Sequence, residues 1–213
     1  MDLLTLITAC APLVAPTTLK AIVLEESRGH PYAIHDGATG KAIFPESKEK
    51  AVSIARRLIA SGSRIDAGLA QINSENWSWL GLNVERVFDP CTNLAAGERV
   101  LLSAYSAAPY TVDAALSRYN TGDATRGVRN GYVGRVKSWF EKPQPARRYQ
   151  LDGVTSGTAE EGNRVSVRAS LDVTEEQASD GAEMADARVS EARVPKAPAW
   201  HFEPVVDGFG GGG

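Results

Sequence analysis

Apolar residues repeat at helical spacing along the first two thirds of the chain. Leu19, Ile22 and Val23 mark one face of a helix expected over residues 16–27, which opens at a proline, a residue tolerated in the first helical turn. A second helix is expected over residues 48–61, because apolar positions recur there every three to four residues. The same spacing predicts later helices over residues 93–107, 112–117 and 132–141. The pattern is therefore typical of a mainly α-helical domain.

One small β excursion interrupts this helical pattern. Residues 32–34 and 41–44 flank a turn that contains Gly37 and Gly40, so they predict a short hairpin. No internal repeat is recognisable, and no series of strands indicates a large sheet. We therefore expect an α+β domain in which the β part is minor.

The first 16 residues are apolar and contain no Lys or Arg. They are too short to span a membrane and lack the basic start of a signal peptide, so we expect a first helix packed on the domain. Ile7–Cys10 looks like a lipoprotein cleavage box, which is the alternative interpretation. No other export signal is evident.

The net charge of the chain hides two segments of opposite sign. The 213 residues include 23 Lys or Arg and 26 Asp or Glu, which gives a formal charge of -3. Residues 1–150 carry 18 basic and 14 acidic side chains, whereas residues 151–213 carry 5 and 12. The near balance argues against a polybasic nucleic-acid-binding protein, and a hydrophobic content of 43% suits a globular domain with a packed core.

The acidic segment is predicted to be a tail. It contains no Ile, has Leu only at Leu151 and Leu171, and ends in a run of glycines. So few large apolar side chains cannot offset the entropy of ordering the backbone. We therefore expect a folded domain over residues 1–147 and a mostly disordered tail over residues 148–213. The aromatic cluster at residues 200–209 is either a docking motif that folds on a partner or a set of residues without function.

The chain contains two cysteines, Cys10 and Cys91, which lie far apart in the sequence. Their spacing matches no CxxC motif and no metal-ligand pattern. They form either one long-range disulfide, if the compartment is oxidising, or two buried thiols.

Glu25 and Glu26 are adjacent carboxyl groups near the end of the first long helix. At 100° per residue, Glu26 falls inside the apolar stripe and Glu25 falls outside it. A carboxyl group on the core-facing side of a helix is costly to ionise, so its pKa should be raised, as a general acid working near neutral pH requires. The structural alternative is that Glu26 pairs with a buried arginine or caps a neighbouring backbone.

Three motifs follow one another along the chain: E-S-R-G at Glu26–Gly29, G-L-A-Q-I-N at Gly68–Asn73 and Y-N-T-G at Tyr119–Gly122. With Tyr132 opening the last expected helix, this order resembles the goose-type-lysozyme-like lytic transglycosylases that cut peptidoglycan. The segments around Cys10 and Cys91 are similar to the accessory transglycosylases of type IV secretion systems, the VirB-system family. The resemblance covers about residues 5–145 and implies a lysozyme-like fold.

The resemblance also implies an activity. Glu26 is expected to be the single catalytic acid and base that cleaves the β-1,4 bond between N-acetylmuramic acid and N-acetylglucosamine. No second carboxylate stands out in the second and third motifs, so the 2-acetamido group of the sugar is expected to stabilise the oxocarbenium ion. Attack of the C6 hydroxyl on C1 then gives a 1,6-anhydromuramyl end. The alternatives are a hydrolytic lysozyme on the same fold and a non-catalytic peptidoglycan-binding scaffold.

The cleft is expected between the Glu26 helix and the Gly68–Asn73 segment, and the resemblance assigns three motif residues of these two segments to substrate binding. Ser27 is expected to orient the acetamido group, unless it only caps its own helix. Gln71 is expected to hydrogen-bond the sugar, and Asn73 is either a sugar ligand or a local cap.

The third motif and several aromatic residues complete the expected site. Tyr119 is expected to hydrogen-bond Glu26 or to line the floor of the cleft, and Asn120 to fix the turn at Gly122. Three aromatic residues are candidates either for sugar stacking or for the core: Trp77, Trp79 and Tyr105. Trp139 and Phe140 are expected in the core.

Neither a metal ion nor a cofactor is expected, because the three histidines share no metal-ligand spacing and no phosphate-binding glycine motif follows a strand. The expected partners are peptidoglycan glycan strands and, through the tail, components of the secretion apparatus. Nucleic acid and a transmembrane span are not expected. The family resemblance implies action in the periplasm of a Gram-negative bacterium, where the wall is opened locally for secretion or conjugation machinery.

Overall fold

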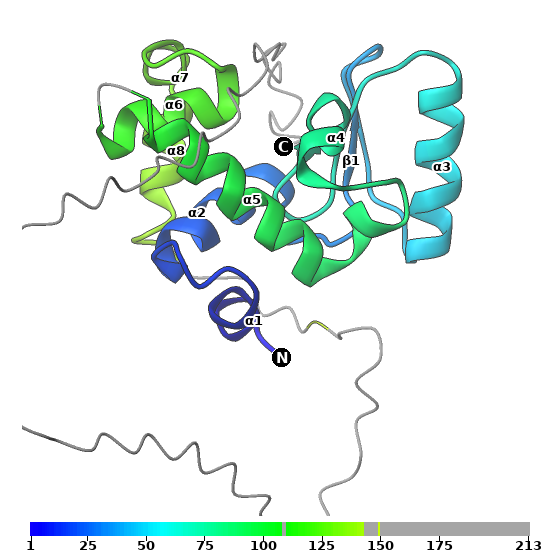
Figure 1. Cartoon of the computed structure of the whole chain (residues 1–213), viewed down its shortest axis with the longest axis horizontal. Helices are drawn as coiled ribbons and strands as arrows, with labels where there is room; N and C mark the ends of the chain where they lie inside the picture. The colour runs from blue at the N-terminus through cyan, green and yellow to red at the C-terminus, as the bar shows by residue number, and fades with distance from the viewer. Residues whose placement is uncertain (108–109, 143–148, 150–213) are drawn as a thin grey trace, which may run out of the picture. The chain divides into compact units, whose positions relative to one another are not determined.

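The computed structural model of the chain describes residues 1–107, 110–142 and 149 (Figure 1). Except for Tyr149, the tail expected over residues 148–213 lies outside the described residues, and so does its aromatic cluster at 200–209. Within the described part of the chain, no helix is both long and apolar enough to cross a membrane.

Helices dominate the described structure, as the sequence predicts. In chain order they are α1 (Leu3–Cys10), α2 (Pro16–Ser27), α3 (Lys48–Ala60), α4 (Trp77–Leu80), α5 (Pro90–Tyr105), α6 (Val112–Thr121), α7 (Arg126–Arg129) and α8 (Tyr132–Ser138), with 3-10 turns η1 (Ser74–Asn76) and η2 (Arg86–Phe88). Helix α6 runs past its expected end at residue 117, because Gly122 supplies the left-handed C-cap at φ 70°. The two four-residue helices, α4 and α7, are too short to show a helical period and were not predicted.

A small antiparallel sheet lies beside α3. Its strands are β1 (Ile34–Asp36), β2 (Lys41–Ile43), β3 (Ile65–Ala67) and β4 (Ile72–Asn73), in the order β2-β1-β3-β4. The predicted hairpin is β1–β2. Strand β3 is a longer-range partner of β1 and forms a second tight hairpin with β4, and the sequence pattern revealed neither β3 nor β4. Strands of two and three residues are too short to display alternation.

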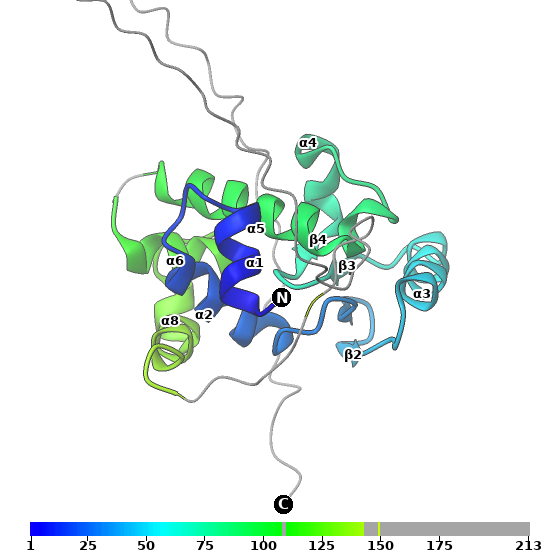
Figure 2. The same cartoon turned by 90° about the horizontal axis from the view of Figure 1, so that it is seen from below.

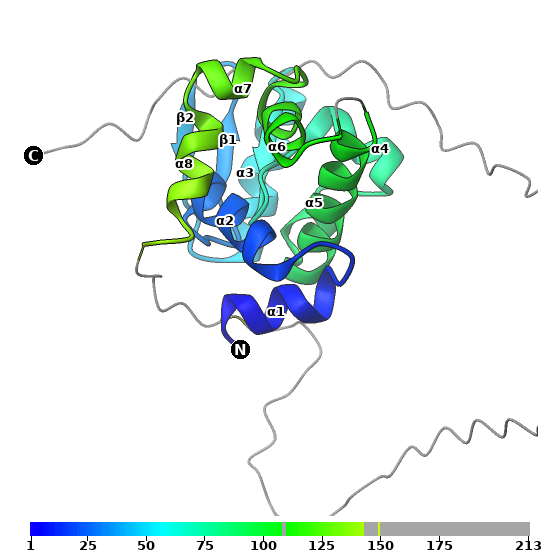
Figure 3. The same cartoon turned by 90° about the vertical axis from the view of Figure 1, so that its left-hand side faces the viewer.

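Helix α2 is the central element of the helical part. It contacts α1 and α8, and Figure 3 shows it between these two helices. Its residues Leu19 and Ala21–Leu24 are at most 2% exposed, so it is covered on most sides. Glu25 is covered as well, with a side chain only 11% exposed, although the helical spacing of 100° per residue placed it outside the apolar stripe. The spacing did not predict this burial because α8 packs against α2 on that side.

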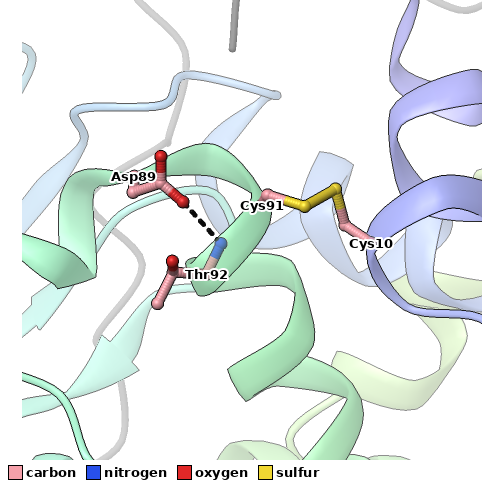
Figure 4. The surroundings of a disulfide bond; sticks show 4 residues. All are labelled: Cys10, Asp89, Cys91 and Thr92. Atoms are coloured by element: carbon pink, nitrogen blue, oxygen red, sulfur yellow. Dashed lines mark hydrogen bonds between the residues drawn. A yellow bond between two sulfur atoms is a disulfide. The ribbon is translucent and has the colours of Figure 1, made fainter. Parts of the chain in front are cut away.

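A disulfide joins Cys10 at the end of α1 to Cys91 in the first turn of α5 (Figure 4). The two Cα atoms lie 5.1 Å apart although the residues are separated by 81 positions in the sequence. Asp89 accepts a hydrogen bond from the Thr92 amide at 2.7 Å, which caps α5 beside the bridge. Figure 2 shows α1 next to α5, and the two helices are in contact, so the bridge fastens a contact that they also make by packing.

Tyr149 belongs to the folded domain although the predicted boundary was residue 147. Its side chain is 5% exposed, and its hydroxyl donates to the main-chain oxygen of Gly29 at 2.7 Å. Its amide donates to the main-chain oxygen of Met1 at 2.8 Å. The folded domain therefore includes Tyr149, whose side chain hydrogen-bonds the segment that follows α2.

Candidate active site

Glu26 lies in the last turn of α2 and keeps part of its side chain exposed. The hydroxyl of Tyr132, the first residue of α8, donates a hydrogen bond to Glu26 Oε1 at 2.5 Å. The structure thus pairs the predicted acid with a tyrosine 106 positions away. The sequence identified Tyr132 as part of a motif but did not identify it as the partner of Glu26.

Burial of its carboxyl group raises the pKa of Glu26 from 4.5 to about 8. The hydrogen bond from Tyr132 acts in the opposite direction, because it favours the ionised form. The negative charges of Asp66 and Glu25 raise the pKa further, and the positive charge of Arg135 lowers it. At neutral pH the carboxyl group is therefore mostly protonated and titrates close to that pH, as expected of a group that both gives and takes a proton.

The neighbouring Glu25 is held in a different way. Its carboxylate accepts hydrogen bonds from Arg135 Nε at 2.7 Å and from Trp139 Nε1 at 3.0 Å. The guanidinium of Arg28 lies over the Trp139 ring, 4.9 Å from its centroid. Trp139 is therefore a partly buried link between α8 and α2. Phe140 is 53% exposed, so its predicted core position is wrong.

Ser27 connects the end of α2 to the second motif. Its hydroxyl is fully buried, lies 2.7 Å from the main-chain oxygen of Leu69, and also reaches the oxygen of Val23 at 3.1 Å. A hydroxyl without exposed surface offers nothing for a ligand to contact in this conformation. The contacts match the backbone-capping interpretation of Ser27 and add a tie to the segment between β3 and β4.

The second motif is a tight turn that other side chains brace. Gly68 has φ 83°, and a Cβ there would lie 2.2 Å from Asn93 Nδ2, so only glycine fits. The Asn93 side chain donates to the main-chain oxygens of Ala67 and Val87 and accepts from the Ala70 amide at 2.7 Å. Asn93 is a supporting residue that no sequence motif identified.

Gln71 lies in the same turn with φ 46°, a left-handed conformation that is unusual for a residue with a side chain. Its amide nitrogen donates to the main-chain oxygens of Ala33 and Gly68, at 3.1 and 2.9 Å. These bonds use both amide hydrogens and leave Oε1 as the acceptor that a ligand donor could reach. Asn73 caps η1, because its Oδ1 accepts from the Glu75 amide at 2.9 Å.

The third motif forms the last turn of α6. Tyr119 is 5% exposed, and its hydroxyl donates to the main-chain oxygen of Ala70 at 2.8 Å, so it holds the main chain of the second motif in place. The partly exposed Asn120 accepts a hydrogen bond from Asn130 Nδ2 at 3.1 Å, which links α6 to the segment just before α8. Asn120 was expected to fix the turn at Gly122, and Gly122 is the residue that ends α6.

The three aromatic candidates for sugar stacking occupy different environments. Trp77 is 8% exposed and donates to the main-chain oxygen of Ile72, so it is a core residue. Trp79 is partly buried, with the Arg99 guanidinium 5.4 Å from its ring centroid. Tyr105 is 44% exposed.

A row of polar side chains crosses one face of the sheet. His35, Asp66 and Asn73 stand in register on β1, β3 and β4. Asp66 Oδ1 accepts from Asn73 Nδ2 at 2.8 Å, and Asp66 Oδ2 lies 3.2 Å from His35 Nδ1. The hydrogen bond to Asp66 raises the pKa of His35. Asp66 was not predicted to be a site residue, because Asp66 precedes the second motif and belongs to a strand that was not predicted.

Known proteins that the chain resembles identify its family. Residues 5–140 match the transglycosylase SLT domain. The chain is 40% identical over 142 residues to protein virB1 of Agrobacterium fabrum, an alignment that covers 64% of this chain and 58% of that protein. It is 37% identical over 142 residues to the type IV secretion system protein virB1 of Brucella abortus, with 60% and 59% covered. The chain thus spans less than two thirds of the length of these relatives, and no solved structure matches it significantly.

The family match extends over more than half of the chain and includes all three motifs together with Tyr132. The mainly α-helical fold with a small antiparallel sheet, predicted from the sequence, is confirmed. The chain belongs to the transglycosylase SLT domain family.

Proposed function

We propose that this protein is a peptidoglycan lytic transglycosylase that cleaves the β-1,4 bond between N-acetylmuramic acid and N-acetylglucosamine. The observation that carries the proposal is Glu26, a half-buried residue whose carboxyl pKa is raised by burial to about 8 and whose oxygen is fixed by Tyr132. Membership of the transglycosylase SLT domain family supports the choice of substrate.

In the first step Glu26 acts as a general acid. It gives its proton to the glycosidic oxygen, the bond between that oxygen and C1 of the muramyl sugar breaks, and the bonding electrons leave with the oxygen. Burial keeps Glu26 protonated at neutral pH, so the proton is present when substrate binds. The 2-acetamido group of the sugar stabilises the positive charge that develops at C1.

In the second step the same residue acts as a general base. The Glu26 carboxylate takes the proton of the C6 hydroxyl while that oxygen attacks C1, which closes the 1,6-anhydro ring and restores protonated Glu26. The Tyr132 hydrogen bond stabilises the carboxylate between the two steps. No water is consumed, which distinguishes this reaction from hydrolysis.

The motif residues take supporting parts in this proposal. Gln71 Oε1 is the polar atom of the second motif that we assign to the sugar, because the amide nitrogen is already used by the main chain. Ser27 and Tyr119 hold the second motif against the ends of α2 and α6. We assign Asn73 and Asn120 to the same framework of the cleft.

The biological setting is also proposed. One relative is named as a type IV secretion system protein, and we propose that this chain likewise opens the wall locally for a secretion or conjugation apparatus. A disulfide between α1 and α5 suits an oxidising compartment, which favours the periplasm. The acidic tail is the segment that we assign to contacts with components of the apparatus.

Digestion of purified sacculi tests the reaction. Mass spectrometry of the released fragments is expected to find 1,6-anhydromuramyl ends, because the C6 hydroxyl and not water attacks C1. Reducing ends alone would make the protein a hydrolytic lysozyme. Absence of any released fragment would favour the non-catalytic scaffold.

Replacing Tyr132 with Phe is expected to lower turnover by about 10- to 100-fold at pH 7 and to move the basic limb of the pH profile to higher pH. The hydroxyl favours the ionised form of Glu26, so its loss raises the pKa of Glu26 further. A hydrogen bond to a charged group contributes about 1.5–3 kcal/mol, and about 1.4 kcal/mol corresponds to tenfold in rate. The measurement is the pH–rate profile of the variant beside wild type.

The matched control is Tyr119→Phe, which removes a buried hydroxyl that bonds to Ala70. The basic limb of the pH profile of Tyr119→Phe is expected to coincide with that of wild type, even if the variant is less stable. A basic limb that does not move in Tyr132→Phe would contradict the assigned role of that hydroxyl.

A further inference from the structure

The polar row on the sheet contains a carboxylate that the mechanism above does not use. Both oxygens of Asp66 accept hydrogen bonds, one from Asn73 and one from His35, and the side chain is 17% exposed. Because an ionised carboxylate only accepts, His35 must carry its proton on Nδ1. The arrangement therefore suits a fixed, charged carboxylate that still reaches the surface.

The fold brings this carboxylate to the end of α2. Asp66 lies on β3, three positions before Leu69, whose main-chain oxygen accepts from Ser27, the residue next to Glu26. Gln71 of the same turn bonds back to Ala33, just before β1. Among the charges that act on Glu26, that of Asp66 has the largest effect on its pKa, ahead of the adjacent Glu25.

The two carboxyl groups have contrasting environments. Glu26 is desolvated and protonated at neutral pH, with one tyrosine hydroxyl as its hydrogen-bond donor. Asp66 has two donors and remains in partial contact with solvent. One desolvated carboxyl group beside a second, hydrogen-bonded carboxylate that keeps contact with solvent is the arrangement of the acid and the charge-stabilising group in a glycosidase.

We propose that Asp66 is a second carboxylate of this site, which His35 and Asn73 hold in place and which stabilises the positive charge that develops at C1 of the bound sugar. The proposal rests on the proposed function of Glu26 and deepens it. Asp66 forms no covalent bond in this role, and the acetamido group and the C6 hydroxyl keep their parts.

The test compares Asp66→Asn with wild type on soluble peptidoglycan glycan strands. The asparagine keeps the shape, its oxygen still accepts from Asn73, and its amide can donate to a neutral His35, so the fold is expected to survive. Turnover is expected to fall about 100-fold, with KM within about threefold, because a charge acting in the transition state is removed. Rates are normalised to the folded fraction measured by thermal melting.

The pH profile separates this role from a purely structural one. The groups that face Glu26 are Glu25 of its own helix, Tyr132 and Arg135 of α8, Tyr119 of α6 and Asp66 of β3. Loss of the negative charge of Asp66 lowers the pKa of Glu26, so the basic limb is expected to move to lower pH. The control Glu75→Gln removes an exposed carboxylate beside the sheet, and its profile is expected to match wild type.

Three outcomes would overturn the proposal. The first is turnover of Asp66→Asn within threefold of wild type while Glu26→Gln is inactive, which leaves the proposed function of Glu26 intact. The second is an unmoved basic limb in the pH profile of Asp66→Asn, and the third concerns Asp66→Glu. Asp66→Glu, which restores the charge, is expected to be at least tenfold faster than Asp66→Asn, and equal rates would also contradict a role for charge. Retained cleavage in Glu26→Gln would instead refute the proposed function itself.

Discussion

Replacing Glu26 with Gln is expected to lower the rate of wall cleavage by about 1,000-fold or more. General acid–base catalysis contributes about 10²–10⁴-fold for a single group, and Glu26 serves in both steps. The amide oxygen can still accept the hydrogen bond from Tyr132, so the geometry of the site is preserved. The measurement is the release of soluble fragments from sacculi by wild type and variant at equal concentration.

The same substitution is expected to stabilise the protein at neutral pH. The pKa of Glu26 is about 8 in the folded protein and near 4.5 when solvated. Between these values the folded state holds a proton that the unfolded chain has lost, so the free energy of unfolding of wild type falls as pH rises through this window. A neutral glutamine removes that dependence, and the gain at pH 7 is on the order of 3 kcal/mol.

Thermal melts at two pH values test this gain. At pH 4 both states of wild type are protonated, and the two proteins should melt together. At pH 7 the variant should melt higher by about 10 °C, since 1 kcal/mol shifts Tm by about 2–4 °C in a domain of this size. The control is Glu46→Gln, whose exposed carboxylate pairs with Lys50, and its Tm should change little at either pH. Equal melting of Glu26→Gln and wild type at pH 7 would contradict the raised pKa.

A loss of activity together with a gain of stability identifies Glu26 as a functional group. A glutamate that merely paired with a buried arginine would lose stability on substitution, because its partner charge would be left unpaired. The described hydrogen-bond partner of Glu26 is a neutral tyrosine hydroxyl, whereas Arg28 and Arg135 both pair with Glu25. An ion pair with arginine therefore holds Glu25 and not Glu26.

The sequence predicted those elements whose local signals are long and consistent. Helix α2 begins at Pro16 and ends at Ser27 as expected, because the proline and the apolar period agree. Helix α3 likewise begins after Ser47, whose hydroxyl accepts from the Lys50 amide. These signals are contained within one element and need no information about tertiary packing.

Most of the features that were missed depend on contacts between distant segments. Strand β3 pairs with the distant β1, whereas β4 pairs with β3 across a short turn, and both strands are too short to show a local period. The role proposed for Asp66 depends on the tie between the end of α2 and the segment after β3, which Ser27 makes through the main-chain oxygen of Leu69. Tyr132 was recognised as a motif residue, but its bond to Glu26 bridges α8 and α2. Sequence spacing cannot show such pairings.

Several predicted site residues turn out to support the site through the main chain. Ser27 and Tyr119 bond to the oxygens of Leu69 and Ala70, and Asn73 caps η1. Polar residues in a motif are equally suited to holding a turn and to binding a sugar, so residue type alone does not separate the two roles. Their direct contact with substrate stays a prediction.

Removing the disulfide is expected to lower the stability of the domain strongly. Cys10 and Cys91 close a loop of 81 positions, for which the chain-entropy relation gives about 4.5 kcal/mol, at the upper end of the usual range of about 2–5 kcal/mol. The double variant Cys10→Ala, Cys91→Ala should therefore melt about 10 °C or more below wild type. Differential scanning calorimetry with and without dithiothreitol measures the effect.

The reductant should lower the Tm of wild type to about that of the double variant and leave the double variant unchanged. Below the melting transition the double variant should keep wild-type turnover, because the bridge joins α1 to α5 whereas Glu26, Tyr132 and Asp66 lie on α2, α8 and β3. Equal Tm values for oxidised and reduced wild type would show that packing of α1 on α5 fastens this contact without help from the bridge. A loss of turnover in the folded variant would instead show that the bridge also sets the position of α2.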